Sequence, residues 1–156
     1  MSKLYDRNKA IQYAQEWALK RNPKYYNYDS IGGDCTNFIS QCLLAGGGIM
    51  NYTKTFGWYY INANNKSPSW SGVNYLYNFL TRNFGGVGPI GKKISRNKVK
   101  EGDLIQLAFN KKVLEHSLII TKIEDEEIFV TTHTEDSLNR NLKNYNYSDI
   151  RFIHIE

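Results

Sequence analysis

The sequence predicts an α+β domain in which N-terminal helices pack on a C-terminal antiparallel sheet. Apolar residues recur at helical spacing through much of the first 80 positions, whereas after residue 99 they fall in short runs separated by turns. A glycine-rich loop at residues 85–91 separates the two parts. With 156 residues the chain is long enough to bury a core, and we expect residues 1–156 to form a single domain.

Three helices are expected in the first part. Residues 6–20 place apolar side chains near one helical face and precede an Asn-Pro pair. Residues 36–44 form a strongly apolar second helix that three successive glycines end, and residues 70–80 form the third. The long polar segment between them, residues 49–71, is typical of a functional loop and is predicted to form a binding lip.

Four strands are expected in the second part, at residues 104–109, 117–123, 128–133 and 151–155. An acidic turn at residues 124–127 joins the second strand to the third, so these two should be antiparallel neighbours.

Composition restricts the partners. The net charge is +5, but the basic residues are dispersed among acidic ones, so nucleic-acid binding is not expected, whereas an anionic polymer such as cell wall is compatible. Neither an export signal nor an apolar run long enough to cross a bilayer is visible. We therefore expect a protein that is cytoplasmic as encoded, or exported if a leader was removed. The sequence carries no signal for oligomeric state.

Cys35 is the candidate nucleophile. It follows Gly32, Gly33 and Asp34 and enters the first turn of the second helix, where free amides and the helix dipole favour a thiolate. Asp34 is placed to cap this helix. The alternative is a small buried hydrophobe, which is the interpretation preferred for Cys42, two turns further on. The two thiols are too far apart along one helix to form a disulfide.

Two histidines are candidates for the same site. His116 begins the second expected strand and His133 ends the third, so antiparallel pairing is predicted to bring their side chains together. A helix headed by Cys35 and packed on that edge would complete a Cys-His-His line. In this line Cys35 is the nucleophile, His116 the general base and later the acid, and His133 the residue that orients His116. His154 alternates with isoleucines and is interpreted as structural.

Aromatic residues near these positions are candidates for substrate binding. Tyr28 lies just upstream of Cys35, either lining a cleft or anchoring its loop. Trp58 belongs to the predicted lip, and Trp70 either fixes the third helix to the core or faces the cleft.

Several short blocks spread over nearly the whole chain carry a family likeness. They are Tyr5-Asp6-Arg7, Tyr13-Ala14, Asn22-Pro23, the run GGDCTNFISQ at residues 32–41, Gly57-Trp58, Ser69-Trp70 and His133-Thr134. These blocks resemble the bacterial putative amidase domain family, related to the papain-like cysteine hydrolases that include the NlpC-type and CHAP cell-wall amidases and peptidases. The run around Cys35 is the most specific part of the likeness.

The resemblance implies a papain-like fold in which Cys35 heads the central helix and His116 opens a core strand. The third polar residue of such hydrolases comes from the next strand, where this sequence has His133. Asp136 is the rival for that role.

Within the matched run, the resemblance assigns Asp34 to support of the helix start, and Asn37 is expected to be a hydrogen-bonded structural residue.

The leading hypothesis is hydrolysis of an amide bond in a peptidoglycan stem peptide or a related small amide, without a cofactor. An acyltransferase using the same Cys-His pair is one alternative. A catalytic zinc site formed by Cys35, His116 and His133 is another, although no short paired-ligand motif is present. The last alternative is a non-catalytic wall-binding module that uses Trp58 and Trp70.

Overall fold

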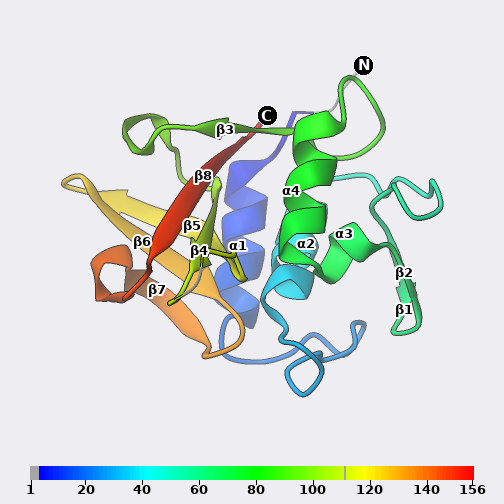
Figure 1. Cartoon of the computed structure of the whole chain (residues 1–156), viewed down its shortest axis with the longest axis horizontal. Helices are drawn as coiled ribbons and strands as arrows, with labels where there is room; N and C mark the ends of the chain where they lie inside the picture. The colour runs from blue at the N-terminus through cyan, green and yellow to red at the C-terminus, as the bar shows by residue number, and fades with distance from the viewer. Residues whose placement is uncertain (1–3, 111) are drawn as a thin grey trace.

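The computed structural model describes residues 4–110 and 112–156 and confirms the α+β class, with N-terminal helices packed against a six-stranded antiparallel sheet (Figure 1). The helices are α1 (Arg7–Trp17), α2 (Cys35–Ala45), α3 (Pro68–Ser71) and α4 (Val73–Arg82), with short 3-10 turns η1 (Arg96–Lys98) and η2 (Leu142–Asn144). The strands are β1 (Tyr60–Asn62), β2 (Asn65–Lys66), β3 (Gly91–Ile94), β4 (Leu104–Ala108), β5 (His116–Glu124), β6 (Glu127–Thr132), β7 (Ser137–Asn141) and β8 (Asp149–Ile155). None of the helices within these residues is both long and apolar enough to cross a membrane.

The six strands are arranged in the order β3-β8-β4-β5-β6-β7. The four predicted strands correspond to β4, β5, β6 and β8, and β5 and β6 are antiparallel neighbours as expected. The edge strands β3 and β7 were not predicted, because an edge strand needs few apolar residues and gives a weak pattern. A small hairpin, β1–β2, lies inside the segment predicted to be irregular.

The predicted third helix is two helices, because the chain is extended at Gly72, with φ −109° and ψ 128°. A Cβ at this position would lie 2.8 Å from the Tyr75 ring and 2.9 Å from the Pro68 carbonyl oxygen. Glycine therefore permits the sharp change of direction between α3 and α4.

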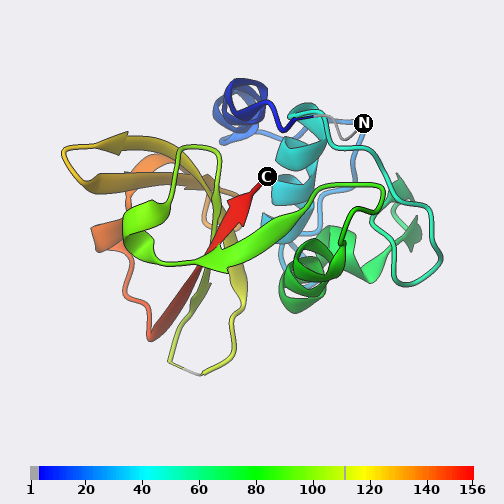
Figure 2. The same ribbon diagram turned by 90° about the horizontal axis from the view of Figure 1, so that it is seen from above.

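The sheet is buried on both faces. One face packs against the helices in a core that includes Phe38 of α2 and Ile119 of β5. The other face holds a second core that includes Leu118 and Ile120, covered in part by Tyr145. Figure 2 shows α2 between α1 and the other helices, on one side of the sheet. From His116 to Ile120 of β5, odd-numbered residues consequently face the helices and even-numbered residues face the second core. The register shift between Ile120 and Lys122 reverses this alternation, so that Ile123 packs against the second core.

Candidate functional site

A buried contact joins the head of α2 to the beginning of β5. The hydroxyl oxygens of Thr36 and Ser117 are 2.9 Å apart, and the Ser117 hydroxyl also accepts a hydrogen bond of 3.2 Å from the Gln106 amide. Cys35 directly precedes Thr36, and His116 directly precedes Ser117. The two candidate catalytic residues therefore flank one fixed contact. A serine before the apolar run Leu118–Ile120 was the only sequence signal for this contact.

The Cys35 thiol is nearly enclosed, with 7% of the residue exposed. Its sulfur lies 3.8 Å from the Thr36 hydroxyl. Burial raises the pKa of Cys35, and the neighbouring Asp34 charge adds to this, while hydrogen bonds from Ser117 and Thr36 act in the opposite direction. The predicted preference for a thiolate is thus wrong for the resting protein, because loss of hydration outweighs the helix terminus. Cys35 rests as a neutral thiol.

His116 is also almost enclosed, with 8% of the residue exposed. Its ring lies 6.0 Å from the Phe109 ring and 6.4 Å from the Tyr145 ring. Burial lowers the pKa of His116 to about 4, since a charged imidazole would lose its hydration there. At neutral pH the ring is therefore neutral and able to accept a proton. It lines a hollow of about 520 Å³, together with Thr134, Glu135 and other residues.

The predicted contact between the two histidines is not what the structure shows. His116 lies on the same face of β5 as Leu118 and Ile120, which are in the second core. Its ring packs beside Phe109 and Tyr145, which also contact the second core. His133 instead stacks on Phe38 of α2, with ring centroids 3.8 Å apart. The strands are neighbours, but the two side chains project to opposite faces of the sheet.

Both ring nitrogens of His133 are engaged elsewhere. Nδ1 lies 2.6 Å from a carboxylate oxygen of Asp34, and Nε2 lies 2.7 Å from the carbonyl oxygen of Trp17. A carboxylate and a carbonyl oxygen only accept hydrogen bonds, so both nitrogens donate and the ring is an imidazolium. His133 thus forms a buried ion pair that ties β6 to the start of α2 and the end of α1.

Asp34 is the centre of this network. Its carboxylate accepts hydrogen bonds of 2.8 Å from the Tyr28 backbone amide and from the Asn37 side chain, and the Arg21 guanidinium lies 3.5 Å away. Asp34 occupies the N-cap position of α2, and its carbonyl oxygen accepts a hydrogen bond of 3.0 Å from the Phe38 amide, but no backbone amide of the helix bonds to its side chain. Asp34 holds the first turn indirectly, through the side chain of Asn37.

Asp136, the rival third residue, is bound by Arg21 instead. Two nitrogens of the guanidinium donate to its two carboxylate oxygens, each at 2.9 Å, and Asp29 accepts a third hydrogen bond from the same group at 2.6 Å. Within residues 4–110 and 112–156, the His116 ring has no hydrogen-bond partner, so neither Asp136 nor His133 orients it there. The role of Arg21 had no signal in the sequence.

The tryptophans lie in the core rather than on a binding surface. Trp58 and Trp70 have no exposed area and their rings are 4.9 Å apart. Each indole N–H is satisfied internally, by Ser40 for Trp58 and by Asn37 for Trp70. The hypothesis that these two residues grip a polymer is therefore wrong. They fasten the 49–71 segment to α2.

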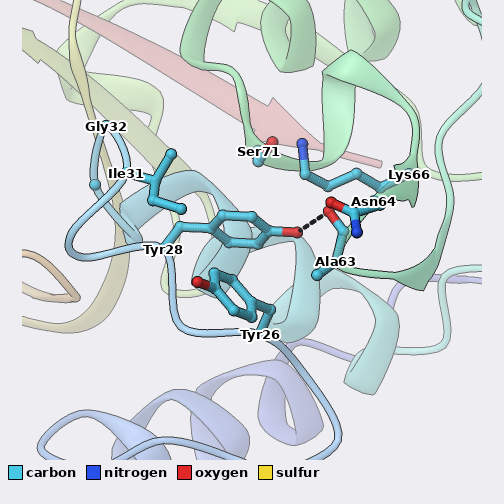
Figure 3. A pocket seen from close by; sticks show the side chains of 9 residues that line it. Tyr26, Tyr28, Ile31, Gly32, Ala63, Asn64, Lys66 and Ser71 are labelled. Atoms are coloured by element: carbon cyan, nitrogen blue, oxygen red, sulfur yellow. Dashed lines mark hydrogen bonds between the residues drawn. The ribbon is translucent and has the colours of Figure 1, made fainter.

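Tyr28 both lines a hollow and anchors its loop. Its hydroxyl donates a hydrogen bond of 2.9 Å to the Ala63 carbonyl oxygen, while its ring forms part of the wall of a hollow (Figure 3). The interpretation of Tyr28 as an anchor of its loop is thus confirmed, whereas a role in binding substrate stays a prediction.

The hypothesis of a catalytic zinc site is not supported by the arrangement of the described side chains. In the described part of the chain, no three His, Cys, Asp or Glu side chains are grouped so that they could hold a metal ion. Because His133 already uses both nitrogens, it cannot join Cys35 and His116 as a ligand without breaking its own hydrogen bonds.

Comparison with known proteins relates almost the whole chain to one family. The family model described as Putative amidase domain matches residues 4–155. Two similar proteins of Bacillus subtilis strain 168 are the uncharacterized proteins YhbB and YjcM, 31% and 28% identical over 149 and 138 residues. The alignments cover 93% and 83% of this chain but 45% and 31% of those relatives, so the chain spans less than half of either protein. No solved structure matches the chain significantly.

Proposed function

Because this chain belongs to the Putative amidase domain family, we propose that it hydrolyses an amide bond with Cys35 as nucleophile and His116 as general base. The observation that carries this proposal is the 2.9 Å contact between Thr36 and Ser117, which sets the two residues on either side of one buried point. A papain-like arrangement, with the nucleophile heading the central helix and the base opening a strand, is part of the proposal.

The resting charges define the first step. A neutral thiol and a neutral imidazole require the proton to pass from Cys35 to His116 as the sulfur attacks the carbonyl carbon. No hydrogen bond joins these two side chains among the described residues, so His116 must turn toward the sulfur when substrate binds. Catalytic contacts often tighten only in such complexes.

The remaining steps return both residues to their starting state. The imidazolium of His116 gives its proton to the leaving amine, and the acyl group stays on sulfur as a thioester. Water then loses a proton to His116 as its oxygen attacks the thioester, which releases the acid and restores the thiol. In this proposal the backbone N–H of Cys35, in the first turn of α2, donates a hydrogen bond to the developing oxyanion.

The substrate class we propose is a peptidoglycan stem peptide or a related small amide. A net charge of +5 suits attraction to an anionic wall polymer. Since both tryptophans are buried, we assign substrate selection to the hollow lined by His116 and to the hollow lined by the loop that leads into Cys35.

The test uses four proteins: the unchanged chain, Cys35→Ala, His116→Ala and the control Cys42→Ala, which loses the other thiol. Each is incubated with purified wall fragments and a panel of short peptides, and new termini are identified by mass spectrometry. We expect cleavage by the unchanged chain and by Cys42→Ala, and a loss of at least 100-fold in the other two. Cleavage by Cys35→Ala at the original rate contradicts the proposal. Adding an amine acceptor in H₂¹⁸O separates hydrolysis from acyl transfer.

A further inference from the structure

A second hollow, of about 540 Å³, adjoins the loop that leads into Cys35. Gly33 lines it, and Thr134 of the His116 hollow packs directly on Gly33, with its hydroxyl 3.2 Å from where a Cβ would stand. The Gly33 backbone has a φ of +104°, which favours glycine. A lining residue of one hollow is therefore in contact with a lining residue of the other, at Gly33, two residues before the proposed nucleophile.

The wall of this hollow carries a cation without an acidic partner. Lys66 is partly buried, and its ammonium lies 5.1 Å from the centre of the Tyr28 ring. Over the described ranges 4–110 and 112–156, no carboxylate lies within ion-pair distance of this ammonium. Burial lowers the pKa of Lys66, because the group has lost water and no anion compensates for it.

Neutral polar groups and aromatic faces surround this cation. Figure 3 shows the Lys66 side chain reaching toward Ser71, with Asn64 beside it and the rings of Tyr28 and Tyr26 across the hollow. Within the same described ranges, the side chains of Asn64 and Ser71 make no hydrogen bond to the protein. They are therefore available to a ligand, while the two rings offer apolar surface.

We propose that this hollow binds a carboxylate-bearing part of the substrate, with Lys66 pairing with the carboxylate and Asn64 and Ser71 completing its hydrogen bonds. The assignment as a substrate site rests on the proposed function of Cys35. A carboxylate fits better than a phosphate, because one ammonium matches a single negative charge and no arginine lines the hollow. An acidic residue held here places its neighbouring amide near the head of α2.

The test measures binding without turnover. Lysines of the Cys35→Ala protein are reductively ¹³C-methylated, which keeps their charge, and the Lys66 signal is assigned by its loss in Lys66→Arg. The probes are acetyl-Gly-Glu-amide and acetyl-Gly-Gln-amide, which match in shape and differ in charge. We expect a saturable shift of the Lys66 signal with the glutamate peptide, and at least tenfold weaker binding of the glutamine peptide.

Two further arms make the result decisive. Lys92 is exposed and distant in sequence from this hollow, so Lys92→Met should bind the acidic peptide unchanged, whereas Lys66→Met should lose at least tenfold. Equal binding of both peptides, or no saturable shift at Lys66, overturns the proposal, and tighter binding of inorganic phosphate overturns the choice of a carboxylate. Because no bond is cleaved in this assay, inactivity of Cys35 would overturn only the proposed function.

Discussion

Replacing His133 by alanine tests whether this residue is a structural cation or the third catalytic residue. The substitution removes the 2.6 Å ion pair with Asp34, the hydrogen bond to the Trp17 carbonyl oxygen and the stacking on Phe38. Asp34 is left 1% exposed with a charge that has lost its closest cation. We therefore expect a large loss of stability.

The magnitude follows from what remains around Asp34. Removing one partner of a buried ion pair costs about 3–5 kcal/mol. The carboxylate keeps two hydrogen bonds of 2.8 Å, from Tyr28 and Asn37, and the Arg21 guanidinium at 3.5 Å. These contacts favour the lower end of this range, about 3 kcal/mol. The lost stacking adds about 1 kcal/mol. The expected loss is thus about 4 kcal/mol.

The assay is urea unfolding of the unchanged chain, His133→Ala, Asp34→Asn and the double variant, with catalysis measured on each folded protein. The double variant should lose much less than the sum of the single losses, because removing the second partner relieves the orphaned charge. A loss below about 1 kcal/mol combined with complete inactivity would refute this reasoning and return His133 to the role of orienting His116.

Two further predictions concern the thiols and pH. Iodoacetamide at neutral pH should alkylate Cys35 at least tenfold faster than Cys42, which has no exposed area and a pKa raised further by burial. Equal alkylation rates for the two thiols, measured by mass spectrometry, would count against a reactive Cys35. The pKa of His116 is about 6.5 in the unfolded chain, and burial lowers it to about 4 in the folded chain. The unfolded state therefore binds more protons between these two pH values, and the free energy of unfolding should fall by about 3 kcal/mol as pH decreases through this window. Urea unfolding of His116→Asn should show a pH dependence shallower by that amount; an unchanged profile would mean that His116 is hydrated.

The fold was predictable wherever one periodicity dominated. Helix α2 and strands β4, β5 and β6 carry continuous apolar patterns, because each is buried in the centre of the molecule. The edge strand β7, with the sequence SLNRN, has one buried residue at its start and no pattern to detect. The break at Gly72 was not predicted, since the apolar residues from Val73 to Leu80 have helical spacing and only contacts with neighbouring residues select the extended conformation of Gly72.

The sequence predicted where Cys35 and His116 lie in their helix and strand, but not which side chains His133 contacts. A cysteine after Gly-Gly-Asp marked the head of α2, and a histidine opening an apolar strand marked the start of β5. Which face of the sheet the His133 side chain occupies depends on the strand register. A shift of one residue in that register moves the side chain to the other face, and such a shift cannot be seen in the sequence. Its partner Asp34 is 99 positions away in the chain, so no local pattern could pair them.

The buried charges explain why His133 lies near the proposed nucleophile, Cys35, without contacting His116. Asp34 directly precedes Cys35, and its negative charge raises the pKa of the thiol, which opposes formation of the attacking thiolate. The His133 imidazolium at 2.6 Å and the Arg21 guanidinium at 3.5 Å supply positive charge against that carboxylate. Asp34 can then hold the first turn of α2 through Asn37 with less penalty on the sulfur. His133 is therefore expected to act on the proposed site by compensating Asp34, while its side chain lies on the opposite face of the sheet from that of His116, the proposed base.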